Sequence, residues 1–186
     1  MRADLPSGVE LLPLEQHRDD RGWLSEIFRD DRSPPLRPCQ WNATVSEPNV
    51  LRGMHAHFRH RDYLVVVHGR LSVGLFDIRE ESATYRSGAI VEVSGDAVSA
   101  LCVPVGVLHG FYSHAQTIYI YGVDAYFDPS DELGCHWSDP GLNLEWPCTA
   151  PVLSPRDRNA GTLHQVEEQF RAAVGLRRAT AVSPLA

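Results

Sequence analysis

Lysine is absent from this chain of 186 residues, and all 17 residues of the lysine and arginine class are arginine. The absence excludes every mechanism that needs a lysine Schiff base or a lysine electrophile. No apolar run approaches the roughly 18–20 residues of a membrane span, and residues 1–6 lack the basic start and apolar stretch of a signal peptide. We therefore expect a cytoplasmic protein without a membrane partner.

A basic block is also missing, and the net charge is -7. Surfaces that bind nucleic acid need clustered positive charge, so we expect no nucleic-acid partner, although a few arginines can still bind a phosphate. The four cysteines contain no CxxC pair, which argues against a zinc knuckle and against a disulfide framework. We expect reduced and mostly buried thiols at Cys39, Cys102, Cys135 and Cys148.

Short runs rich in valine, isoleucine and tyrosine dominate the chain between Val9 and Trp146. They predict β-strands at residues 63–68, 71–78, 89–93, 100–103 and 117–121. Many short strands without a βαβ rhythm indicate an all-β sandwich or barrel with antiparallel strands. The tight turn at His68-Gly69-Arg70 predicts a hairpin between the first two of these strands.

Residues 161–176 are the one persuasive helix, because apolar side chains recur there at helical spacing. We expect a loose tail at residues 177–186. The chain then forms a single domain, residues 1–186, with a core at about 9–160 and a short C-terminal helical segment. Barrels of this kind often pair through exposed edge strands, so we expect a homodimer.

Histidines cluster at His55, His57 and His60. On a strand, His55 and His57 face the same side, because side chains alternate with period two. Farther on, Pro104 and Gly106 precede His109 at a predicted strand start. Together with Asp62 and Gly69, these residues resemble the two motifs of a cupin, a jelly-roll β-barrel.

The cupin resemblance implies a metal site as one possibility. In metal-binding cupins the matching residues are the ligands, here His55, His57, Asp62 and His109. Three imidazoles and one carboxylate suit one divalent ion such as Fe, Mn, Ni, Cu or Zn. Asp62 stands where the usual residue is glutamate, which shortens the reach by one methylene.

A narrower resemblance covers roughly residues 9–160. The segments that carry it occur in the right order and are Asp20-Arg21-Gly22, Asn42, Val50-Leu51-Arg52-Gly53-Met54-His55, Pro104 to Phe111, Ile120-Tyr121, Asp128-Pro129, Trp137 to Pro147 and Leu153 to Asp157. Together they resemble the dTDP-4-dehydrorhamnose 3,5-epimerase family. The segment from Trp137 to Pro147 is far more specific than the cupin pattern.

The resemblance implies a proton-transfer reaction. A C4 ketone acidifies the C3 and C5 protons, so a base removes one and an acid on the opposite face returns it with inverted configuration. The resemblance makes His55 the base and Asp157 its partner, which orients the imidazole and stabilises its charged form. Tyr121 matches the acid, and Tyr119 has the same strand parity and is the alternative.

Substrate-binding residues also follow from the resemblance. Arg21, Arg52 and Arg156 would bind a diphosphate, for which forked guanidinium groups are well suited. Glu26 and Asn42 would contact the nucleotide or the sugar. His109 would contact the sugar or the enolate.

The chain departs from the family pattern at Asp62, where the family carries a lysine that holds the enolate oxygen. Such an oxyanion partner is commonly worth about 2.7–4 kcal/mol of barrier. Three explanations stay open: Arg59, Arg61 or His109 supplies the positive charge, the site has become a metal centre, or the protein binds a nucleotide sugar without converting it.

The leading hypothesis is an isomerase that epimerises a dTDP-linked 4-keto-6-deoxyhexose at C3, C5 or both, without a cofactor. The alternative is a metal-dependent cupin oxygenase or isomerase that uses the four ligands named above. If His55 ligated the metal, it could not also be the free base. A four-ligand metal site that includes His55 and an epimerase site that uses His55 as the base therefore exclude each other. The third hypothesis is a non-catalytic sugar-nucleotide binder.

Overall fold

The computed structural model describes residues 5–32 and 36–181. The strands are β1 (Glu10–Pro13), β2 (His17–Asp19), β3 (Gly22–Leu24), β4 (Gln40–Ser46), β5 (Leu51–Ala56), β6 (Asp62–His68), β7 (Arg70–Asp77), β8 (Gly88–Ser94), β9 (Ser99–Val103), β10 (Val107–Ser113), β11 (Thr117–Val123) and β12 (Leu133–Gly134). The helices are η1 (Pro129–Asp131), η2 (Pro140–Leu142), α1 (Pro155–Arg158) and α2 (Leu163–Ala181). The predicted all-β fold with a C-terminal helix is confirmed.

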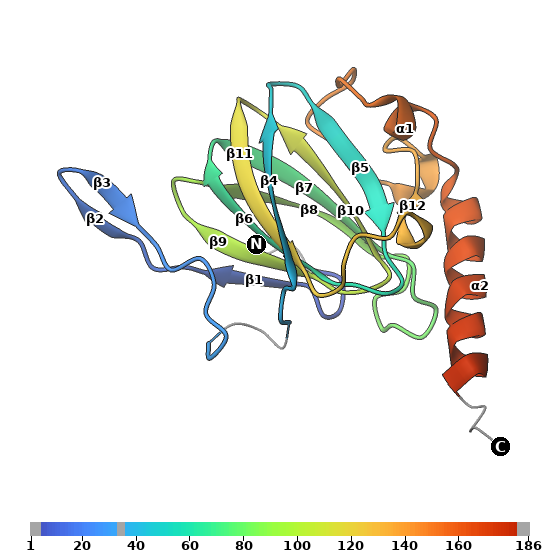
Figure 1. Cartoon of the computed structure of the whole chain (residues 1–186). Helices are drawn as coiled ribbons and strands as arrows, with labels where there is room; N and C mark the ends of the chain where they lie inside the picture. Colours follow the sequence, from blue (N-terminus) through green and yellow to red (C-terminus); the bar gives the residue numbers. More distant parts are fainter. Residues whose placement is uncertain (1–4, 33–35, 182–186) are drawn as a thin grey trace.

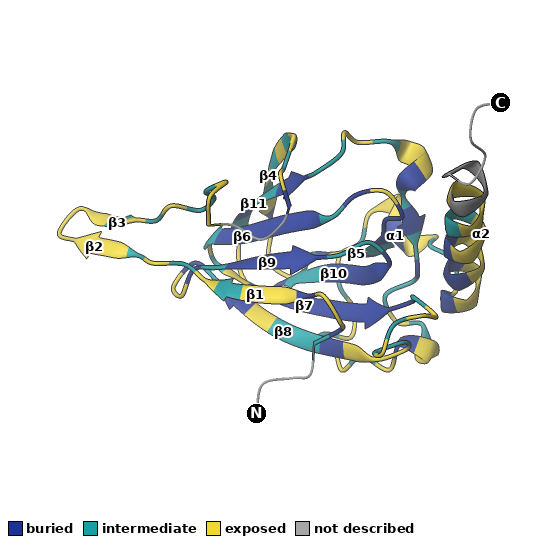
Figure 2. Ribbon diagram, turned by 90° about the horizontal axis from the view of Figure 1, so that it is seen from below, coloured by how far each residue is buried: buried dark blue, intermediate teal, exposed yellow. Residues whose placement is uncertain are grey.

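Two five-stranded antiparallel sheets form the body of the molecule (Figure 1). One has the strand order β1-β9-β6-β11-β4 and the other the order β12-β5-β10-β7-β8. Strand periodicity sends Leu64 and Val66 of β6 into the interior core, while Tyr63 and Val65 pack on the outer face of the same sheet. Figure 2 shows that β6, β7 and β9 are mostly buried, as the apolar runs at 63–68, 71–78 and 100–103 predict.

The hairpin predicted at His68-Gly69-Arg70 is wrong, because the turn carries the chain from one sheet to the other. β6 is paired with β9 and β11 on its two edges, and β7 is paired with β10 and β8. Their apolar side chains meet across the interior core and not side by side. Gly69 has φ +78°, and a Cβ there would lie 2.5 Å from the Gln116 carbonyl oxygen. The tight turn therefore needs glycine, but its local signal does not reveal which sheet follows.

The C-terminal helix is longer than the sequence predicts. α2 ends at Ala181, so residues 177–181, which we expect in a loose tail, are helical, and residues 182–186 lie outside the described residues. Leu163, Val166 and Phe170 bury one face of α2 against an apolar cluster that includes Met54 and Leu108. Across the described chain, no helix is long and apolar enough to cross a membrane.

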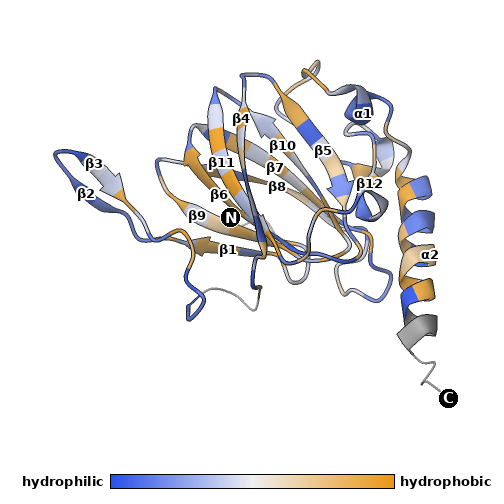
Figure 3. Cartoon of the chain, viewed as in Figure 1, coloured by the Kyte–Doolittle hydropathy of each residue, from blue (hydrophilic) through white to orange (hydrophobic). Residues whose placement is uncertain are grey.

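The β2–β3 hairpin projects away from both sheets (Figure 1). Most of its residues are exposed, and its colouring in Figure 3 is largely hydrophilic. Its short, polar strands give no apolar run, which explains why the sequence analysis does not predict them.

Candidate active site

A cavity of about 320 Å³ opens between the two sheets. One wall comes from β4, β6, β9 and β11 of the first sheet, and the other from β5 and β10 of the second. The loop before α1 and part of α1 add a third side. Of the predicted site residues, the cavity is lined by Asn42, Arg52, His55, His57, Asp62, His109, Tyr121, Arg156 and Asp157.

His55 and Asp157 form a hydrogen-bonded pair although they are 102 positions apart in the chain. His55 Nε2 lies 2.7 Å from Asp157 Oδ1. Asp157 Oδ2 accepts a second hydrogen bond from the hydroxyl of Ser154, the residue that caps α1. Because Nε2 is engaged with the carboxylate, Nδ1 is the nitrogen of His55 that can take a proton from a substrate.

The environment of Asp157 keeps it ionised. Burial alone would raise its pKa, but the hydrogen bond and charge of His55, with help from Ser154 and Arg156, hold the pKa below the usual value. An ionised carboxylate beside an imidazole stabilises the imidazolium that forms when the base accepts a proton.

Tyr121 and Tyr119 lie on the same face of β11, and both line the cavity. Tyr121 is half-buried, whereas Tyr119 is only 3% exposed. Burial raises the pKa of each phenol, so both are protonated at neutral pH. Tyr121 stands on the sheet opposite His55, which is the arrangement that a two-sided proton transfer requires.

The predicted substrate-binding residues fall into two groups. Arg52, Asn42 and Arg156 are at the cavity. Arg21 and Glu26 are not among its lining residues: Arg21 lies in the turn between β2 and β3 with its side chain 89% exposed, and Glu26 lines a separate hollow with Arg29. Within one chain, Arg21 and Glu26 therefore lie away from the cavity that holds the other predicted site residues.

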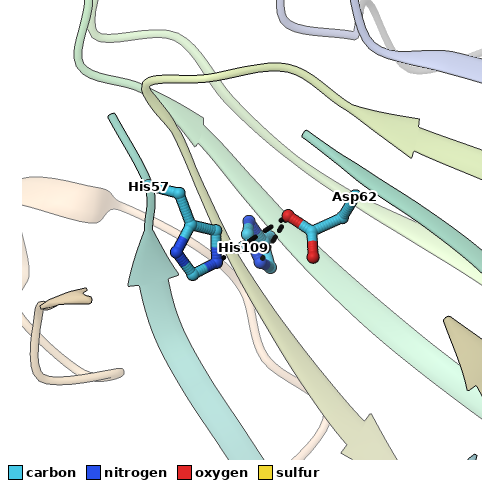
Figure 4. A group of neighbouring side chains, drawn as sticks. All are labelled: His57, Asp62 and His109. Atoms are coloured by element: carbon cyan, nitrogen blue, oxygen red, sulfur yellow. Dashed lines mark ion pairs between the residues drawn. The ribbon is translucent and has the colours of Figure 1, made fainter. Parts of the chain in front are cut away.

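His57, Asp62 and His109 form a tight cluster in the cavity (Figure 4). Nε2 of His57 and Nε2 of His109 each lie 3.7 Å from Asp62 Oδ2. His55, the fourth ligand expected from the cupin resemblance, is not part of this cluster. The reason is that Asp157 draws the His55 ring toward α1.

Burial sets the charges of this cluster. It lowers the pKa of His57 far below the usual range and that of His109 to about 4, so both imidazoles are neutral at pH 7. Burial, followed by the charges of Glu132 and two other carboxylates, raises the pKa of Asp62 well above its usual value. An ionised Asp62 is therefore costly here unless a cation joins it.

Three further side chains, those of His60, Asp131 and Glu132, support the cluster. His60 stacks on the His57 ring at 3.8 Å between centroids, and its Nδ1 is 2.8 Å from Asp131 Oδ2. Glu132 lies 3.3 Å from His57 Nδ1 and 2.8 Å from Arg156. The sequence marks His60 as the third histidine of its run, whereas no local sequence pattern marks Asp131 or Glu132 as part of the site.

Arg59 and Arg61, two of the residues that we expect could replace the lysine implied by the resemblance, do not line the cavity. Arg59 is paired with Asp128, and Arg61 Nε lies 2.7 Å from Asp124. Only His109, of the three proposed substitutes, reaches the site.

Comparison with known proteins decides the family. The sequence profile described as dTDP-4-dehydrorhamnose 3,5-epimerase matches residues 5–165. The chain belongs to this family. A dTDP-4-dehydrorhamnose 3-epimerase of Streptomyces niveus is 31% identical over 87% of this chain and 82% of its own length. A spore coat polysaccharide biosynthesis protein of Bacillus subtilis is 30% identical over 75% and 95%.

Solved structures of family members share the fold. The 4-keto-6-deoxy sugar epimerase from the novobiocin gene cluster of Streptomyces spheroides matches with a TM-score of 0.81 at 30% identity, covering 88% of this chain and 86% of that one. A 3'-monoepimerase from Streptomyces bikiniensis in complex with dTDP-quinovose matches with a TM-score of 0.82 at 26% identity, covering 96% and 98%. The predicted cupin-type jelly roll is confirmed, and the named epimerases among these relatives are isomerases.

Proposed function

We propose that this protein is an isomerase that epimerises a dTDP-linked 4-keto-6-deoxyhexose at C3, C5 or both. The observation that carries the proposal is the placement of a histidine–carboxylate pair, His55 with Asp157, on one wall of the cavity and of Tyr121 on the opposite sheet. A base and an acid on opposite faces of a sugar invert the carbon between them. The epimerases among the relatives favour this reaction over the oxygenase chemistry of other cupins.

The proposed reaction consists of two transfers that move two different protons. His55 Nδ1 removes the proton next to the ketone, and the electron pair of that C–H bond passes to the ketone oxygen as an enolate. Tyr121 then delivers its phenolic proton to the other face of the carbon, and the enolate electrons form the new C–H bond. Neither step needs an organic cofactor. Arg52, Arg156 and Asn42 would bind the nucleotide part of the substrate at the cavity.

We also propose a cytoplasmic location. All four cysteines are free, and Cys102 and Cys135 are buried. Free thiols at this density are typical of a reducing compartment.

The test is a proton NMR time course of dTDP-4-keto-6-deoxyglucose with the enzyme in deuterated water. We expect the C3 signal, the C5 signal or both to disappear as deuterium replaces the abstracted proton. Heat-inactivated protein is the control for spontaneous exchange. Tight binding of the substrate without exchange above that control would instead support the non-catalytic binder.

We further propose that a second copy of the chain completes each site. Arg21 and Glu26 can serve the substrate only if the projecting β2–β3 hairpin reaches the cavity of a neighbour, because they do not line the cavity of their own chain. In such a homodimer, each chain would supply residues to the active site of the other, so the dimer would be needed for activity.

Co-expression of Arg21→Ala chains with His55→Asn chains tests the second copy. Each variant alone has no complete site. If the hairpin acts across the dimer, half of the dimers are mixed and each mixed dimer has one intact site, so about a quarter of wild-type activity returns at limiting substrate. Activity no higher than the sum of the two separate variants would mean that Arg21 acts within its own chain or not at all.

A further inference from the structure

Three lone-pair donors converge on one point of the cavity. Nε2 of His57, Nε2 of His109 and a carboxylate oxygen of Asp62 all lie within 4.8 Å of one another, and the residues are 4–7% exposed. Within the described chain, no donor hydrogen-bonds the Asp62 carboxyl, and its ion-pair partners are the two histidines at 3.7 Å. A separation of 3.7 Å is too long for a hydrogen bond.

The tautomer of His109 is fixed by the backbone. Its Nδ1 lies 3.0 Å from the carbonyl oxygen of Val107, which can only accept, so Nδ1 carries the proton. Nε2 of the neutral ring therefore presents a lone pair toward Asp62. A backbone carbonyl on the far nitrogen is the support that metal-ligating histidines usually have.

His57 is held in the same sense. Its Nδ1 is buried and makes no hydrogen bond within the described chain, but the negative charge of Glu132, whose Oε1 lies 3.3 Å away, favours the proton on Nδ1 and leaves the lone pair on Nε2. The stacked ring of His60, itself hydrogen-bonded to Asp131, fixes the plane of the imidazole. Two imidazoles are thus pre-oriented with their acceptor nitrogens toward one carboxylate.

The spacing fits a shared ion. Metal–nitrogen and metal–oxygen bonds of about 2.1 Å separate two ligand atoms by about 3.6 Å when the angle between them is about 120°, close to the 3.7 Å from each histidine to Asp62. Such an ion would join three atoms that otherwise repel one another through their lone pairs.

We propose that His57, Asp62 and His109 bind one divalent transition-metal ion beside the His55–Asp157 pair. Two imidazoles and one carboxylate select a first-row ion such as Fe, Co or Zn over Mg²⁺, which prefers oxygen ligands. Because His55 is outside the ligand set, the ion and the catalytic base can act together. This removes the conflict that a four-ligand site would create.

The proposed role rests on the proposed epimerisation. An ion at this point acts as a Lewis acid toward the substrate's ketone oxygen, and so supplies the positive charge that a chain without lysine cannot take from an ammonium group. The ion-binding proposal itself stands on the three side chains alone.

The first test is a titration of metal-stripped protein with Co²⁺, followed by the visible absorption of the ion and by calorimetry. We expect one ion per chain, no competition from millimolar Mg²⁺, and affinity at least 100-fold weaker in Asp62→Asn and in His109→Asn. His55→Asn is the matched control and should bind Co²⁺ as the wild type does. Circular dichroism and thermal unfolding of the stripped variants check that each is folded.

Three results would overturn the binding proposal: no stoichiometric Co²⁺ in the wild type, equal affinity in all folded variants, or loss of binding in His55→Asn. The last would restore His55 as a ligand.

The second test separates the ion's role from the proposed function. We expect stripped protein to exchange the substrate proton about 100-fold more slowly and to recover with Co²⁺ or Zn²⁺. Full exchange in stripped protein would overturn the role and leave the epimerase proposal intact. Co²⁺ binding with no exchange in any state would overturn the epimerase proposal and the ion's role in it, and would leave the ion-binding proposal intact.

Discussion

Replacing His55 by asparagine is expected to lower the rate of proton exchange at the substrate about 1000-fold, because general-base catalysis contributes roughly 100- to 10,000-fold. Asparagine retains a polar side chain of similar reach but has no basic nitrogen. The rate is measured by the loss of the C3 or C5 proton signal in deuterated water. His114→Asn is the matched control, since His114 is hydrogen-bonded to Ser72 and does not line the cavity.

The same prediction extends to the partner of the base. Asp157→Asn should cost less than His55→Asn, and the double variant should be no slower than His55→Asn alone, because the carboxylate acts only through the imidazole. Additive losses would mean that Asp157 has a role of its own. A His55→Asn rate within threefold of wild type would exclude His55 as the base.

The interior strands could be predicted from sequence because they are buried and apolar. The runs at residues 63–68 and 71–78 become β6 and β7 almost to the residue. β2 and β3 are only three residues long, and in β4 exposed residues alternate with partly buried ones, so no apolar run marks any of these strands. Pairing is harder still: the Gly69 turn has the local features of a hairpin, and only the competition of β9 and β11 for the edges of β6 excludes that pairing.

The candidate site shows a similar limit. Strand parity correctly puts His55 and His57 on the same cavity, but it does not reveal that Asp157, far along the chain, binds one of them. That contact separates the two histidines into a proposed base and a proposed ligand. The sequence marks Asp62 only as an expected departure from the family pattern, whereas its closeness to His57 and His109 depends on how β6 and β10 face each other across the cavity.

Asp77→Ala is expected to produce the largest loss of stability away from the cavity. Asp77 is fully buried at the end of β7 and accepts hydrogen bonds from Arg79, Ser82 and Thr84 at 2.6–2.8 Å. Removing one member of a buried charged network costs about 3–5 kcal/mol, because the others lose their partner. The free energy of unfolding in urea measures the loss.

Glu92→Ala is the matched control for Asp77→Ala, because Glu92 also pairs with an arginine, Arg70 at 3.2 Å, but on the surface. We expect a change below about 1 kcal/mol there. Equal losses in the two variants would mean that burial does not strengthen the Asp77 network.

The effect of Asp77 also carries a pH signature. Burial alone would raise its pKa, but the hydrogen bonds from Arg79, Ser82 and Thr84 hold the pKa in the folded protein below the ordinary 3.8. The native state therefore binds this proton less readily than the unfolded chain, so the stabilisation is present above pH 3.8 and is lost as the pH falls through the folded pKa. The difference in unfolding free energy between wild type and Asp77→Ala should be constant from pH 5 to 7 and should shrink below about pH 4. A difference that grew in acid would require a folded-state pKa above the unfolded one, and the hydrogen bonds to Asp77 would then not be those of a carboxylate.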